Sequence, residues 1–380
     1  MTRPDAIVIG AGIVGATSAL SLTNAGLRVL IIDRGTVASG TTGAGEGNIL
    51  VSDKEPGPEL TLALKSRDLW FAMQEDVGDS FELEAKGGVV VARHDDAPLM
   101  KFAAEQSEHG VKIEKLNHAS LHEKEPYISQ DISSGVYYPQ DAQCQPMLAA
   151  AHVIRTVVAR GGAVISNAKV TAVLTENGRV LGVETSKGKF LAPIVVNATG
   201  TWAGEVAKLA GSHLPIAPRK GFILVTEPAP QYIFHKVYDS DYVANVASSD
   251  ADLQTSTVVE GTRSGTILIG ASRERVGFDL SMNYQILRIL AEQATSLFPV
   301  LRNVQLLRAY RGFRPYAPDH LPVIGEDSIV KGLWHSAGHE GAGIGLAPGS
   351  AALITDAILG RQSFMDASPF SPSRFSQVNA

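Results

Sequence analysis

The chain has 380 residues, a length that suits one large or two medium domains. Apolar residues make up 44% of it and charged residues 19%, which is typical of a folded protein and excludes a disordered one. The net charge of −6 and the absence of a lysine- and arginine-rich run argue against a nucleic-acid partner and against binding to an anionic membrane surface.

The single cysteine, Cys144, restricts the redox chemistry. It cannot form an internal disulfide, an iron–sulfur site or a CxxC pair, so any electrons that the protein handles must reside on a bound organic cofactor. The apolar stretch over residues 6–22 is interrupted by glycines and hydroxyl residues. It fits neither a signal peptide nor a spanning helix, and we expect a cytoplasmic protein without a membrane span.

A βαβ unit is predicted at the start of the chain. Residues 6–9 are uniformly apolar, as in a buried parallel strand, and residues 16–24 suit a helix that packs closely on a sheet. A second apolar run over residues 29–32 ends at Asp33, which is 23 residues after Gly10.

The turn between the first strand and the helix reads Gly10-Ala11-Gly12-Ile13-Val14-Gly15. Gly10 permits a tight turn, Gly12 lets the backbone approach a pyrophosphate, and Gly15 allows close contact between helix and strand. Asp33 can accept hydrogen bonds from a ribose, and its charge would repel the 2′-phosphate of NADP. The pattern predicts a dinucleotide site formed by Gly10, Gly12, Ile13, Val14, Gly15, Asp33 and Arg34, for either NAD or FAD.

Two glycine-rich segments favour FAD over NAD. Residues 39–48 suit a loop that wraps phosphates and a ring, although a flexible surface loop would have the same composition. Residues 335–349 precede an apolar helix predicted over 350–359, whose N-terminus could stabilise negative charge on a reduced flavin. The contacts expected in these segments are Gly40, Thr41, Thr42, Gly45, Gly47, Asn48, Gly338, His339, Gly341, Ala342, Gly343 and Ile344.

Three further motifs cover residues 195–203 (VVNATGTWA), 266–271 (TILIGA) and 311–325 (RGFRPYAPDHLPVIG). Together with the glycine-rich segments they resemble the D-amino acid oxidase (DAO) superfamily of FAD-dependent oxidoreductases, in the branch of glycine and sarcosine oxidases. The loop Gly45-Glu46-Gly47-Asn48-Ile49 is most similar to the β subunit of opine oxidase and to other β subunits of heteromeric dehydrogenases. The resemblance adds Val170, Ala198, Thr199, Gly200 and Trp202 to the cofactor contacts.

The resemblance also implies an α/β fold in two discontinuous domains. Residues 1–86, 142–216 and 314–380 would form a Rossmann-like FAD-binding domain of the GR2 type. Residues 87–141 and 217–313 would form an α+β substrate-binding domain with a mixed antiparallel sheet.

The chemistry that the resemblance implies is oxidation of the C–N bond of an amino acid or secondary amine that is opine-, sarcosine- or proline-like, with hydride transfer to FAD. Arg314 matches the family arginine that holds the substrate carboxylate, and Tyr242, or Tyr238 instead, matches a tyrosine that hydrogen-bonds it. Arg273 would suit a second carboxylate, or it is a solvated surface charge. His339 is expected to shape the flavin environment rather than to transfer a proton.

The sequence departs from its relatives at two points. Gly341 stands where glycine oxidase has an arginine, and no cysteine occupies the position that tethers the flavin of monomeric sarcosine oxidase, so FAD should be noncovalent. Cys144 lies near the place where heterotetrameric sarcosine oxidase attaches FMN, which leaves open a noncovalent FMN at a subunit interface. A small core residue is the alternative for Cys144.

Three functions follow. The first is the β subunit of a dye-linked dehydrogenase, with a larger flavoprotein α subunit and a small iron–sulfur subunit as partners. The second is a self-sufficient oxidase of glycine, sarcosine or a D-amino acid that produces hydrogen peroxide. The third is a catalytically silent subunit that keeps FAD for folding.

Overall fold

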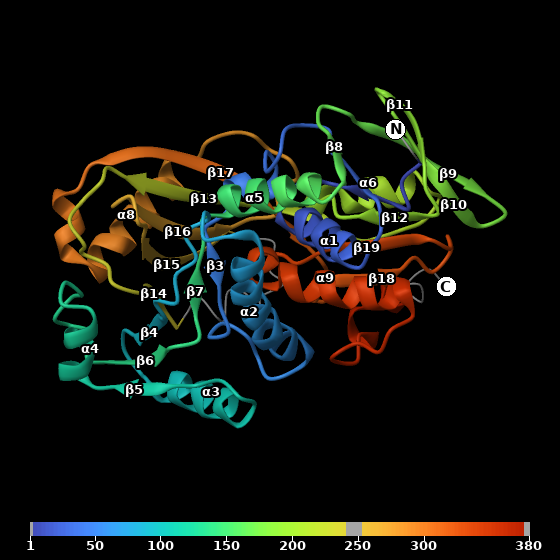
Figure 1. Ribbon diagram of the computed structural model, residues 1–380. Helices are drawn as coiled ribbons and strands as arrows, with labels where there is room; N and C mark the ends of the chain where they lie inside the picture. The colour runs from blue at the N-terminus through green and yellow to red at the C-terminus, as the bar shows by residue number, and fades with distance from the viewer. Residues whose placement is uncertain (1–2, 241–252, 376–380) are drawn as a thin grey trace.

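The computed structural model describes residues 3–240 and 253–375. Two large sheets organise these residues, a six-stranded sheet at one end of the molecule and an eight-stranded sheet at the other (Figure 1). A short antiparallel pair, β3 (Asn48–Ile49) and β7 (Ala142–Gln143), lies between them.

The six-stranded sheet has the order β18-β19-β12-β1-β2-β8. Its pairs are parallel apart from the edge pair of β18 and β19. Every residue of β1 and β2 is buried, which is why these strands read as continuous apolar runs. The bounds are β1 (Ala6–Ile9), β2 (Val29–Ile32), β8 (Ala163–Ile165), β12 (Ile194–Asn197), β18 (Val323–Glu326) and β19 (Leu333–Ala337).

Helices and a small sheet surround these strands. Helix α1 packs against α5 and α9, and α9 packs against α2. The bounds are α1 (Ile13–Asn24), α2 (Pro58–Val77), α5 (Pro146–Ala159), α6 (Ala203–Lys208) and α9 (Gly343–Leu359). The small antiparallel sheet consists of β9 (Val170–Glu176), β10 (Arg179–Thr185) and β11 (Gly188–Leu191).

The eight-stranded sheet has the order β17-β13-β16-β15-β14-β4-β6-β5, and all of its pairs are antiparallel except β4 with β14. Its strands are β4 (Gly88–Ala92), β5 (Glu114–Leu116), β6 (Ser134–Tyr138), β13 (Ala217–Thr226), β14 (Lys236–Asp239), β15 (Gln254–Gly261), β16 (Ile267–Arg273) and β17 (Leu306–Tyr316). Helices α3 (Ala97–Glu108), α4 (His118–Lys124) and α8 (Tyr284–Leu297) accompany it. The predicted fold class, a Rossmann-like sheet with a second mixed antiparallel sheet, is confirmed; the predicted domain limits stay a prediction.

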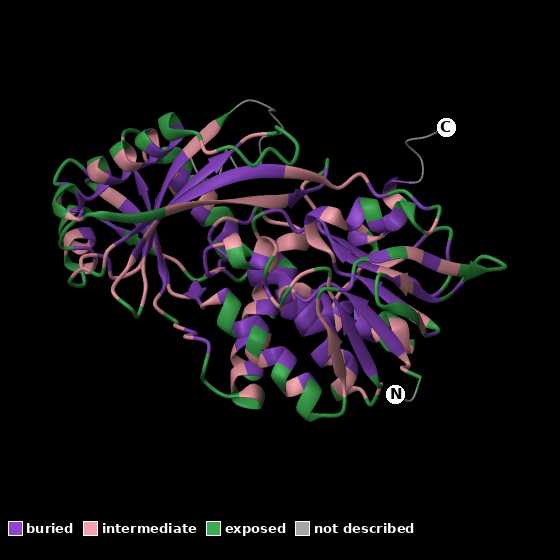
Figure 2. Cartoon of the chain, turned by 90° about the horizontal axis from the view of Figure 1, so that it is seen from above, coloured by how far each residue is buried: buried purple, intermediate pink, exposed green. Residues whose placement is uncertain are grey.

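One core cluster includes residues of both large sheets, and a second forms between the eight-stranded sheet and α8. Most strand residues are buried, while exposed residues gather on helix surfaces and in loops (Figure 2). Helix α8 shows how the second core forms. Asn283 caps its N-terminus, and Ile286, Leu290 and Leu297 share the face that is buried against the sheet. Burying each of these side chains contributes about 1.5–3 kcal/mol. No described helix is both long and apolar enough to span a membrane.

Candidate cofactor and substrate site

A cavity of about 740 Å³ lies where the two large sheets meet. Its volume falls within the range of about 300–1,000 Å³ that is usual for sites of cofactors and drug-sized ligands. Its lining residues come from segments that are far apart in the sequence, within residues 9–14, 32–35, 39–48, 168–171, 198–209, 221–223, 312–315 and 336–344.

The turn after β1 explains two of the glycines. Gly10 has φ of +112°, and a Cβ there would overlap the carbonyl oxygen of Ala198. A Cβ at Gly15 would overlap the carbonyl oxygen of Gly10, so only glycine lets α1 lie this close to β1. Both positions therefore bring the N-terminus of α1 to the wall of the cavity.

Asp33 and Thr42 hold this turn in place. The Asp33 carboxylate lines the cavity and accepts hydrogen bonds from the amides of Ala11 and Gly35, each at 2.7 Å. Thr42, in the 3-10 helix η1 (Thr41–Ala44), accepts through Oγ1 from the Ile13 amide at 3.0 Å. The predicted wrapping loop is thus tied to the helix N-terminus that it was expected to face.

Helix α9 begins at Gly343, seven residues before the predicted start, and this expectation was wrong because Pro348 lies inside the helix. Proline has no N–H for the Ile344 carbonyl, which instead accepts a hydrogen bond from Trp70 Nε1 at 3.0 Å. Ser66 Oγ donates to Gly345 O at 2.6 Å and accepts from the Gly349 amide at 2.9 Å. Side chains of α2 therefore supply the hydrogen bonds that Pro348 removes from the helix, and they hold the end of α9 that lines the cavity.

His339 precedes that helix and is buried at the cavity wall. Its Nε2 lies 2.9 Å from Ser350 Oγ, and Ser350 Oγ lies 2.9 Å from Leu346 O. Because the single hydroxyl hydrogen goes to that carbonyl, we assign the proton of His339 to Nε2. Burial lowers the pKa of His339 to about 4, so the ring is neutral near pH 7.

The burial of His339 predicts a pH effect on stability. The folded state binds its proton only below about pH 4, whereas the unfolded state binds it below about 6.5. The contribution of His339 to the free energy of unfolding is therefore complete above pH 6.5. It falls by about 3 kcal/mol as the pH decreases to 4. Denaturant unfolding of the wild type and of His339→Gln at pH 4 and pH 7 measures it: the variant should lose less stability on acidification, and an equal loss in both proteins would refute the assignment.

Arg314, on β17, also lines the cavity. Its Nη1 donates a hydrogen bond of 2.8 Å to the carbonyl of Ser272, and a Cβ at Gly221 would overlap the same nitrogen. Gly341 lies beside it, since a Cβ there would be 3.6 Å from Arg314 Nε. Gly221 therefore makes room for the guanidinium, and Gly341 borders it at an ordinary contact distance.

The other predicted substrate residues are placed differently. Tyr238 does not line the cavity; it is buried and donates to Ser52 Oγ at 2.5 Å. Arg273 also lies off the cavity wall, and its 3% exposure excludes the solvated surface charge. Tyr242 lies outside the described residues, and its role stays a prediction.

Most predicted cofactor residues line this one cavity. They are Gly10, Gly12, Ile13, Val14, Asp33, Arg34, Gly40, Thr41, Thr42, Gly45, Asn48, Val170, Ala198, Thr199, Gly200, Trp202, His339, Gly341, Gly343 and Ile344. Gly15, Gly47, Gly338 and Ala342 do not. Gly47 instead packs on the backbone of Cys144, where a Cβ would overlap the carbonyl oxygen.

The sequence reasoning missed several residues of the wall, among them Glu46, Phe313, Ser336 and Glu340. Glu46 had a signal, because it is the single acid in a loop of glycines and hydroxyl residues. Glu340 is paired with Arg219 and, at 2.8 Å, with His320. Burial would raise the pKa of Glu340, but these two partners outweigh burial and lower it.

Comparison with known proteins identifies the family. The family model described as FAD dependent oxidoreductase (DAO) matches residues 5–357. A glycine oxidase of Pseudomonas putida is 26% identical over 96% of this chain and 97% of its own length. The hydrogen cyanide synthase subunit HcnC of Pseudomonas aeruginosa is 27% identical over 98% of this chain and 96% of its own length. The crystal structure of L-proline dehydrogenase from P. horikoshii superposes with a TM-score of 0.90 at 25% identity, covering 99% of this chain and 98% of that one.

Proposed function

Because this chain belongs to the DAO family of FAD-dependent oxidoreductases, we propose that it oxidises the C–N bond of an amino acid or secondary amine. The observation that carries the proposal is the position of Arg314. Its guanidinium lines the same cavity as the glycine turn after β1 and the segment around His339. A carboxylate-binding group therefore lies in the cavity that suits the cofactor.

The residues of the cavity fit FAD. The turn at Gly10 and the start of α1 suit the pyrophosphate, and Asp33 lies at the end of β2 where a ribose would be bound. Ser336 Oγ lines the cavity, is buried and lacks a hydrogen-bond partner within residues 3–240 and 253–375, as expected of a group that a bound ligand would satisfy. The flavin supplies the acceptor for the two electrons of the C–N bond oxidation.

The protein's own residues would orient the substrate. Arg314 can bind a carboxylate through two parallel hydrogen bonds, and its contact with Ser272 O holds the guanidinium before the substrate arrives. Neutral His339 can shape the cavity wall without adding a positive charge. Glycine oxidase has an arginine at the position of Gly341. The glycine of this chain leaves space beside Arg314 for a substrate larger than glycine.

The subunit role is the finer part of the proposal. We propose a cytoplasmic β subunit similar to that of opine oxidase, which passes electrons to a larger flavoprotein and a small iron–sulfur subunit. The loop over residues 45–49 supports it, as does the single cysteine, which leaves the chain without an iron–sulfur site of its own. One relative, HcnC, is itself named a subunit. A noncovalent FMN at the interface stays a prediction.

Oxygen turnover by the isolated chain tests the subunit role. We expect amines such as sarcosine and L-proline to bleach the flavin anaerobically, while peroxide forms slowly in air and an added dye accepts the electrons readily. Rapid peroxide formation would support the self-sufficient oxidase instead. Flavin that no amine bleaches would support the silent subunit.

A further inference from the structure

We propose that Glu46 binds the positively charged nitrogen of the substrate, so that the cavity recognises a zwitterion between Glu46 and Arg314. This inference rests on the proposed function and deepens it. It assigns Glu46 a specificity role within the cavity, for α-amino acids and their N-substituted derivatives as a class.

Glu46 lies between η1 and β3 and lines the cavity, although it is only 8% exposed. Its Oε2 accepts a hydrogen bond from Asn48 Nδ2 at 2.9 Å and lies 3.6 Å from Lys236 Nζ. Its Oε1 is buried and has no hydrogen-bond partner among residues 3–240 and 253–375. A buried carboxylate oxygen without a donor is costly, and a ligand with N–H groups would remove that cost.

The charges behind Glu46 add to the attraction. Lys236 is buried between two carboxylates, those of Glu46 and, at 3.1 Å, Glu260. Lys236 is therefore shared by the two acids and lies closer to Glu260, which Lys86 also attracts, so an ammonium in the cavity would give Glu46 a closer partner of its own.

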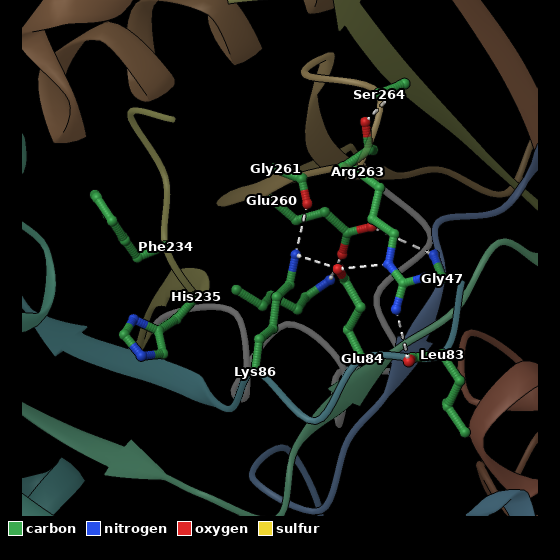
Figure 3. Close-up of polar contacts among 12 residues, drawn as sticks. Gly47, Leu83, Glu84, Lys86, Phe234, His235, Glu260, Gly261, Arg263 and Ser264 are labelled. Carbon is green, nitrogen blue, oxygen red and sulfur yellow. Dashed lines mark hydrogen bonds and ion pairs between the residues drawn. The ribbon is translucent and has the colours of Figure 1, made fainter. Parts of the chain in front are cut away.

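Contacts on the side away from the cavity hold Glu260 in position next to Lys236. Its Oε1 accepts from the Gly47 amide at 3.4 Å, and Lys86 donates to the neighbouring Gly261 carbonyl at 2.5 Å (Figure 3). Glu84 bonds to Arg263 at 2.9 Å on the outer side of this network (Figure 3). The backbone next to Glu46 is therefore tied to β15 through the Gly47 amide.

The distance between the two charged groups suits an α-amino acid. Glu46 Oε1 lies against Gly270, next to Ile223, whereas Arg314 Nη1 lies against Gly221. Gly221 and Ile223 are alternate residues of β13 and lie about 6–7 Å apart along the strand. A carboxylate and an amine on one carbon, with a hydrogen bond of about 2.8 Å at each end, span such a distance. Gly221, Ile223 and Gly312 form the apolar floor between them.

A pair of isosteric probes tests the inference without turnover. 2-Aminoisobutyrate has no α-hydrogen and cannot be oxidised at its α-carbon, and pivalate replaces its ammonium by a methyl group. Both are titrated into the oxidised holoenzyme and followed by flavin absorbance. The wild type should bind 2-aminoisobutyrate more tightly than pivalate. In Glu46→Gln we expect the Kd of 2-aminoisobutyrate to rise about tenfold to a hundredfold, the range for a hydrogen bond to a charged group. The Kd of pivalate should stay equal or fall.

Three further variants separate the outcomes. Glu105→Gln removes one negative charge from an exposed position of α3 that does not line the cavity, and it should leave the ratio of the two Kd values close to the wild type. Arg314→Ala should weaken both probes. Glu46→Asp, which keeps the charge, should give an intermediate ratio and serves if Glu46→Gln fails to fold. A wild type without preference, or an unchanged ratio in the Glu46 variants, would overturn the inference. If the proposed function were wrong, no amine would bleach the flavin, whatever the ratio of the two Kd values.

Discussion

Replacing Arg314 by alanine should raise the KM for the amino-acid substrate by about one and a half to three and a half orders of magnitude. The guanidinium is the proposed partner of the substrate carboxylate, and removing one member of such a charged pair costs about 2–5 kcal/mol because the other charge is left desolvated and unpaired. Steady-state kinetics with a dye acceptor measures KM, and the flavin content of the purified variant shows that the cofactor is retained.

Arg314→Lys is the matched control. Lysine keeps the charge but lacks the planar fork that binds a carboxylate at two points, so it should recover only part of the affinity. It also shortens the reach to Ser272 O, the contact that orients the native side chain at 2.8 Å. A KM that alanine leaves unchanged would remove Arg314 from the substrate site.

Replacing Gly15 by alanine should cost the protein both stability and FAD. The new Cβ would overlap the carbonyl oxygen of Gly10, which belongs to the backbone of the turn and cannot rotate away. Helix α1 would have to move off β1, at an expected cost of about 1–3 kcal/mol or more, and its N-terminus would leave the cavity wall. Denaturant unfolding and the flavin-to-protein absorbance ratio measure the two effects.

Gly345→Ala provides the comparison at a second helical glycine on the cavity side. Its nearest neighbours would lie no closer than 3.4 Å to the new Cβ, so we expect retained FAD and a stability equal to or above that of the wild type. If Gly15→Ala behaved like Gly345→Ala, the tight contact of α1 and β1 would not be what Gly15 provides.

Local patterns in the sequence were sufficient for the βαβ unit. Each run of β1 and β2 is apolar because each strand is buried on both faces, and the glycines of the turn stand where a side chain would overlap backbone. Gly15 is required within the turn, against Gly10, whereas Gly10 is required against the distant Ala198. Both are visible in the order of residues because they belong to one continuous motif. The same holds for Asp33 at the end of β2.

Contacts between distant segments were not visible in this way. The start of α9 depended on Trp70, which donates a hydrogen bond to the Ile344 carbonyl that Pro348 leaves without a helical partner. Tyr238 was a reasonable candidate by its position in the chain, yet its strand directs the hydroxyl to Ser52. Arg273 could equally be a surface charge until its burial was known.

The sequence by itself determined the dinucleotide turn, the two glycine-rich segments and Arg314, because each belongs to a continuous motif. Only the tertiary structure decided what shares the cavity with Arg314. Glu46 is 268 positions away in the numbering and reaches the same cavity only because the segment of η1 and β3 lies between the two sheets. Its chemistry depends on Asn48 in the same loop, on Lys236 of β14 and, through that lysine, on Glu260 of β15. No local pattern records which strands a fold will bring together.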